Sequence, residues 1–165
     1  MAAVFTTLTL AGATLAGLLF VALSLHVSAL RREENLNLRH LAQHTFGNFV
    51  TILFIGLFFI VPSAGADFYA IATLITVAFG LTYMVRRFLM VAREHDNLLY
   101  RKYYLRHTVL SFVSYLLMLL GGVGLLVAPN APGIYYGVLS VFVGVAMMLV
   151  SAMRNSWYLL AHELG

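Results

Sequence analysis

Histidine is the residue type in this sequence whose spacing could support metal chemistry. His40 and His44 are four residues apart, which places both imidazoles on one face of a helix, and this spacing can hold a metal ion. His26 lies near the end of one long apolar segment, and His107 directly precedes another. A metal or haem site built from these four side chains is therefore one hypothesis. The alternatives are that the histidines lie at the interface and bond only to lipid headgroups and water, or that they respond to pH near neutrality.

Other catalytic signatures do not occur in the sequence. The His162-Glu163 pair lacks the second histidine, four residues on, that completes a zinc-protease helix. Paired aspartates, a Gly-x-Ser-x-Gly elbow and a phosphate-binding glycine loop do not occur either, and there is no cysteine. We therefore expect a protein that is not an enzyme and that needs no cofactor.

The composition determines the class of protein. Of the 165 residues, 62% are apolar and only 10% are charged, and the mean hydropathy is +0.92. A soluble domain is closer to half apolar and a quarter charged. Such an excess of apolar side chains would leave large hydrophobic patches in water. A soluble globule, a disordered chain and a disulfide scaffold are excluded, which leaves a polytopic membrane protein, all-α because backbone groups in lipid must pair internally.

Five segments are long and apolar enough to cross a bilayer as helices, since about 20 residues span roughly 30 Å of hydrocarbon. The predicted spans are about 5–30, 45–61, 68–85, 108–128 and 134–153. Short proline and glycine turns over 62–67 and 128–133 join two pairs of them. No basic residue precedes the first segment, so we expect a retained helix rather than a cleaved signal peptide.

The positions of the basic residues predict the orientation. All ten lie in two of the connections or in the tail: Arg31, Arg32, Arg39, Arg86, Arg87, Arg93, Arg101, Lys102, Arg106 and Arg154. Basic residues favour the cytoplasmic side. An odd number of spans, with the N-terminus outside and the C-terminus in the cytoplasm, places all ten there. The net charge of +4 is then a topological signal that also attracts anionic lipid, and we expect no nucleic-acid partner.

The polar connections are predicted to extend the helices beyond the membrane. Residues 31–44, 86–107 and 154–165 are expected to form cytoplasmic helical extensions of a single five-helix domain that covers residues 1–165. A break at His95-Asp96-Asn97 divides the second of these into the two arms of a hairpin, with Asp96 or Asn97 capping the returning helix.

Small and hydroxyl-bearing residues recur at helical spacing on four of the spans. The candidates for helix packing or for lining a pore are Thr7, Thr14, Gly17, Ser24, Thr73, Thr76, Gly80, Ser111, Ser114, Gly137, Ser140 and Gly144. Small faces let helices approach closely and gain dispersion contacts in lipid. One interpretation is packing within one bundle. The other is that a face meets a second copy of the chain, or lines a hydroxyl-rich path for small ions.

Asp67 is the single charge in the connections expected outside. In an oligomeric channel it would form a ring of negative charge at the outer mouth and favour cations. The alternative is that Asp67 caps the third helix. The five spans have no ionisable group near the middle of the membrane, so coupled transport is not favoured.

Two segments resemble a family of small bacterial membrane proteins. The Gly/Thr/Ala-containing helix Gly12–Ser24 and the Asn-x-Trp-containing segment Arg154–Leu160 are similar to the opening and closing parts of that family. The likeness covers the layout of the whole chain. It implies a five-helix protein of the bacterial inner membrane, and the labels of some members imply modulation of a membrane-bound protease. No functional residue is carried over.

Two functions therefore remain from the sequence. One is a homo-oligomeric channel or pore that favours small cations. The other is an accessory subunit that docks on a larger membrane protein. In both, the lipid bilayer is the principal partner.

Overall fold

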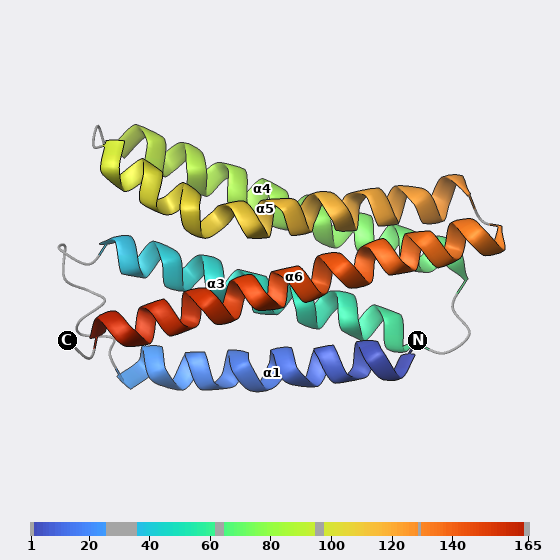
Figure 1. Cartoon of the computed structure of the whole chain (residues 1–165), viewed down its shortest axis with the longest axis horizontal. Helices are drawn as coiled ribbons and strands as arrows, with labels where there is room; N and C mark the ends of the chain where they lie inside the picture. The colour runs from blue at the N-terminus through green and yellow to red at the C-terminus, as the bar shows by residue number, and fades with distance from the viewer. Residues whose placement is uncertain (1, 26–35, 62–64, 95–97, 129, 164–165) are drawn as a thin grey trace.

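The structure is a computed structural model that describes the chain outside residues 1, 26–35, 62–64, 95–97, 129 and 164–165. The described residues form five long helices (Figure 1). They are α1 (Ala2–Leu25), α3 (Leu36–Ile60), α4 (Ala66–Glu94), α5 (Leu98–Val127) and α6 (Ala131–Glu163).

Each helix contains a stretch long and apolar enough to cross a membrane. The stretches are Ala3–Leu25, Leu38–Ile60, Ala66–Met90, Leu105–Val127 and Pro132–Ala161. The prediction of an all-α fold is confirmed, the five stretches are consistent with the five predicted spans, and the chain has the character of a multi-pass membrane protein. The second and third stretches extend past the predicted spans because their polar flanks continue the same helices. The predicted break at 95–97 and the predicted extension over 31–35 lie outside the described residues.

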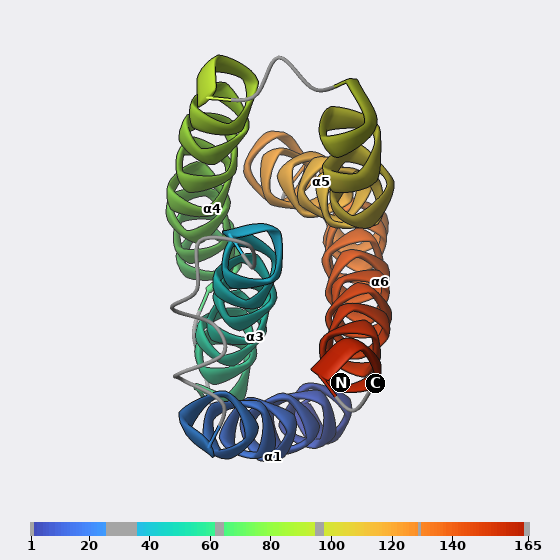
Figure 2. The ribbon, with the colours of Figure 1, turned by 90° about the vertical axis from the view of Figure 1, so that its left-hand side faces the viewer.

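The helices run along the long axis of a flattened bundle. α5 and α6 share the most extensive interface, α1 packs mainly on α3, and α4 packs on α5 and less closely on α3. Viewed from its end, the bundle has α4 and α5 at one edge and α1 at the other, with α3 and α6 between them (Figure 2). α1 begins and α6 ends at opposite ends of the bundle (Figure 1), as an odd number of crossings requires.

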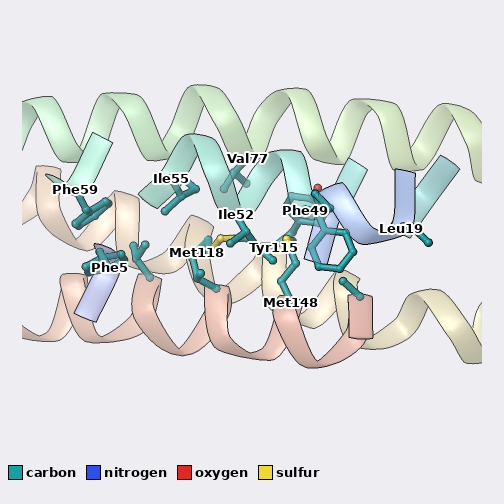
Figure 3. Packing of buried hydrophobic residues seen from close by; sticks show 14 of the residues in the cluster. Phe5, Leu19, Phe49, Ile52, Ile55, Phe59, Val77, Tyr115, Met118 and Met148 are labelled. Atoms are coloured by element: carbon teal, nitrogen blue, oxygen red, sulfur yellow. The ribbon is translucent and has the colours of Figure 1, made fainter. Parts of the chain in front are cut away.

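The core is apolar and lies where α3, α5 and α6 meet. Phe49, Ile52, Met118 and Met148 are fully buried (Figure 3). Side chains of this size fill the interior of the bundle and supply the dispersion contacts that hold helices together in lipid.

The two ends of the bundle differ in charge. α3 and α5 begin, and α4 and α6 end, at the same end of the bundle (Figure 1). This end, which we call the basic end, contains Arg39, Arg87, Arg106 and Arg154. Asp67 lies in the first turn of α4 at the opposite end.

Candidate functional site

The predicted residues of α1 lie on its outer face. Thr7, Thr14, Gly17 and Ser24 are all exposed. The three hydroxyls donate to carbonyl oxygens of their own helix four residues back, at 3.0 Å for Thr7, 2.9 Å for Thr14 and 2.7 Å for Ser24. A Cβ added at Gly17 would meet nothing within 4 Å. This face of α1 therefore contacts no other part of the described chain, and its hydroxyls need no partner from another helix.

The opposite face of α1 packs closely on α3. Phe5 stacks on Phe59 with ring centroids 4.3 Å apart. Gly56 leaves no room for a side chain, because a Cβ there would overlap the buried Thr9. Only 22% of the spanning residues of α1 are buried, against 50% of those of α3. α1 is thus fixed by one face and leaves the other uncovered.

The predicted residues of α6 lie in the α5–α6 interface. Gly137 and Gly144 are buried, and a Cβ at Gly144 would lie 2.6 Å from Met118 Cγ and 2.9 Å from the carbonyl oxygen of Ser114. Ser140 donates a hydrogen bond of 2.8 Å across the interface to the carbonyl of Leu117. This face holds two helices of the same chain together.

The predicted residues of α4 have mixed surroundings. Thr76 is half-buried and donates to the carbonyl of Ala72 at 2.8 Å. Thr73 is fully buried, and its hydroxyl is the one buried side-chain polar atom without a hydrogen-bond partner among the described residues. A Cβ at Gly80 would collide with the ring of Tyr115. Gly80 therefore makes space for an aromatic side chain of α5.

A buried hydrogen-bond network joins α3, α5 and α6 around Ser111. The Asn48 amide donates to the Ser111 hydroxyl at 2.8 Å, and His44 Nε2 lies 3.2 Å from the same oxygen. Ser151 of α6 hydrogen-bonds to it at 3.0 Å. All four residues are buried. Since an unpaired polar group in an apolar interior is costly, this network fixes the register of the three helices.

Two further hydrogen-bonded pairs lie near this network, one between α3 and α5 and one between α5 and α6. Thr51 and Tyr115 hydrogen-bond through their hydroxyls at 3.0 Å. His107 Nδ1 lies 3.2 Å from Asn155 Oδ1, and the Asn155 amide donates to the backbone carbonyl of His107 at 3.4 Å. The predicted Ser114, also buried, donates only to the carbonyl of Leu110 in its own helix.

Of the residues in this network, Ser111 was among the candidates predicted from the sequence, whereas Asn48, Thr51, Tyr115 and Asn155 were not. Their spacing contains a usable signal. His44, Asn48 and Thr51 recur on one face of α3, and polar residues recur at intervals of four on α5 (107, 111, 115) and on α6 (151, 155). Polar residues that repeat on one face of an apolar helix indicate a buried polar seam.

The described histidine candidates lie on two helices, His40 and His44 on α3 and His107 on α5. His44 bonds to α5, and His107 bonds to α6; His40 is half-buried one turn before His44. No three metal-ligating side chains gather anywhere in the described part of the chain. His26, the fourth candidate, lies outside it.

An open pocket of about 340 Å³ lies between α3 and α4, and we call it the α3–α4 pocket. Its polar lining comes from Gln43, His44, Asn48, Thr51, Tyr83 and Tyr115. Its apolar lining includes Phe46 and Phe79, whose side chains are exposed on the outside of the bundle. The pocket therefore opens sideways, towards the surface that faces lipid.

Arg87 of α4 lies beside this pocket. Its guanidinium hydrogen-bonds to the side-chain oxygen of Gln43, and it lies over the ring of Tyr83, 5.5 Å from the centroid. Both groups are neutral. The charge of Arg87 is held in place by these contacts without being neutralised by them.

A second pocket, of about 240 Å³, lies between α4 and α5 and is almost wholly apolar. Met84 lines both pockets. The basic half of α4 is thus flanked by space on two sides, in keeping with its looser packing on α3.

Asp67 is exposed in the first turn of α4. A carboxylate there interacts favourably with the dipole at the start of the helix. α3 lies between α4 and α1 (Figure 2), so Asp67 does not lie beside the outer face of α1.

Comparisons with protein-family models, with curated proteins and with solved structures found no match to this chain. No family is identified, and the class established by the fold is a five-helix, multi-pass membrane protein.

Proposed function

We propose that this chain is a non-enzymatic protein of a bacterial inner membrane that self-associates through the outer face of α1. In this proposal α1 begins outside the cell and α6 ends in the cytoplasm, because that orientation places the basic end on the cytoplasmic side. The assembled copies provide a path for small ions that favours cations.

The observation that carries the proposal is the uncovered small face of α1. Thr7, Thr14, Gly17 and Ser24 are exposed on it together with the larger Leu10 and Val21, and nothing lies within 4 Å of a Cβ at Gly17. Lipid provides no hydrophobic force between helices, so association depends on close approach of backbones, which small residues permit. A second copy of α1 can approach this face more closely than it could approach a face of large side chains.

A path for ions fits between copies better than through one copy. Inside the bundle, Phe49, Ile52, Met118 and Met148 are fully buried and fill the interior. The hydroxyls of α5 are used in hydrogen bonds within the chain. Between copies, Thr7, Thr14 and Ser24 would present oxygen atoms at three levels, separated by roughly 10 and 15 Å along the helix. Such oxygens can replace part of the hydration shell of a cation.

Reconstitution tests the proposal directly. The purified protein is placed alone in liposomes loaded with potassium, and flux is measured together with the oligomeric state in native mass spectrometry. We expect oligomers and a potassium flux larger than the chloride flux. Gly17→Leu, which adds bulk to the outer face without a clash inside the bundle, should lower both.

The accessory-subunit function makes the opposite prediction. Monomers without flux, together with a stoichiometric membrane partner in mild-detergent purification from native membranes, would contradict self-association and support docking on another protein.

A further inference from the structure

The α3–α4 pocket has several polar side chains in a mostly apolar lining, and Arg87 lies beside it in contact with two of its lining residues. Its buried wall consists of His44, Asn48, Thr51 and Tyr115. These groups pair with one another or with α5, yet their side chains still line open space. Polar atoms in hydrocarbon are costly, so even a few polar side chains in a lipid-facing opening favour a ligand with a polar group.

The position of Arg87 defines the charge of a suitable ligand. The residue is half-buried near the end of the spanning part of α4, which closes at Met90. Gln43 and Tyr83 line the pocket, and both hold the guanidinium. Arginine presents five donors in a planar fork that matches the oxygens of phosphate, and one shown hydrogen bond leaves donors for a ligand.

The opening defines the rest of the ligand. Phe46 and Phe79 lie on the two helices that border the pocket and are exposed outwards. A molecule that enters here from the bilayer keeps its acyl chains along these rings while its headgroup lies near Gln43 and Arg87. Its headgroup would be close to the basic end, at the depth where lipid phosphates lie.

We propose that the α3–α4 pocket is a binding site for a phosphate-bearing anionic lipid, whose headgroup is held by Arg87 beside Gln43 and Tyr83 at the end of the pocket nearer the basic end. Basic pockets between spanning helices are the sites at which such headgroups bind. The pocket is separate from the outer face of α1. A negative result for lipid binding therefore leaves self-association untouched, and a negative result for self-association leaves lipid binding untouched.

Lipid retention measures this binding. The full chain is placed in nanodiscs of phosphatidylcholine with a minor fraction of phosphatidylglycerol, and the lipids that remain bound after detergent extraction are counted by native mass spectrometry. We expect selective retention of phosphatidylglycerol. Arg87→Gln should weaken it about tenfold, as loss of a charged hydrogen bond predicts. Arg86→Gln is the matched control, because Arg86 is the exposed neighbour of Arg87 and carries the same charge.

A second variant separates binding from folding. Gly47 lines the pocket, and a Cβ there would lie 3.8 Å from Tyr83, an ordinary contact. The Cβ of a leucine therefore fits at this position, and Gly47→Leu should fill part of the pocket and reduce retention independently of Arg87→Gln. Equal effects of Arg86→Gln and Arg87→Gln, or full retention in Gly47→Leu, would overturn the proposal. Displacement of the lipid by millimolar inorganic phosphate would assign the site to a soluble anion and overturn it as well.

Discussion

The hydroxyl groups of α1 and those of α5 share their chemistry but have different surroundings in the bundle. On α1, Thr14 and Ser24 bond to their own helix and face outwards. On α5, Ser111 is buried and accepts a hydrogen bond from α3 while pairing with α6. The two sets of hydroxyls differ because their neighbours differ. Ser111 faces other polar side chains, whereas the outer face of α1 has no helix of the same chain beside it.

The largest expected change in stability comes from a substitution at Gly144 in the α5–α6 interface, for which Gly17 on the outer face of α1 provides the comparison. Gly144→Val pushes a side chain against Met118 and the backbone of Ser114, so we expect a loss of about 3 kcal/mol in unfolding free energy. Gly17→Val meets nothing within 4 Å and should change that free energy by less than about 0.5 kcal/mol. Reversible unfolding in mixed micelles measures both. Equal losses would mean that the two faces are not packed as described.

The next effect concerns the hydrogen bonds of Ser111. Ser111→Ala removes its bonds to His44, Asn48 and Ser151. At about 0.6 kcal/mol for each hydrogen bond inside a membrane bundle, the expected loss of stability is about 2 kcal/mol. Ser24→Ala is the matched control on α1, since it removes only a bond within its own helix. Thermal unfolding in detergent compares the two variants, and a Ser111→Ala protein as stable as the control would remove the network from the account.

Much of the fold could be predicted from the sequence, because length and hydropathy determine which segments cross a membrane. The spacing of small residues located faces that pack closely, such as the one with Gly144. The same spacing could not show which face meets which helix. α1 and α6 both have small residues at helical spacing, and only the packing shows that one face is uncovered and the other lies in the α5–α6 interface. The polar wall at Asn48 and Tyr115 went unpredicted because the repeat of polar residues along each helix does not say which helix it meets. Their contacts come from pairing α3 with α5, which lie more than 60 residues apart.

The smallest effect is expected at Asp67. Its side chain is exposed on α4, and α3 separates that helix from α1. Exposed charges act over about 8 Å at physiological salt and about 30 Å at 0.01 M. Asp67→Asn should therefore lower potassium flux by less than about twofold at low salt and leave it unchanged at 1 M. A severalfold loss at high salt would place Asp67 at the mouth of the path itself.

The outer face of α1 as the meeting surface of two copies is the central claim, and disulfide crosslinking tests it most directly. The chain has no cysteine, so single cysteines can be added without removing any. Thr14→Cys places one on the outer face of α1, and Ile75→Cys places one at an exposed position of α4. On mild oxidation in native membranes, the account predicts disulfide-linked dimers from Thr14→Cys and few from Ile75→Cys. Equal crosslinking of the two variants, or dimers from Ile75→Cys alone, would contradict it.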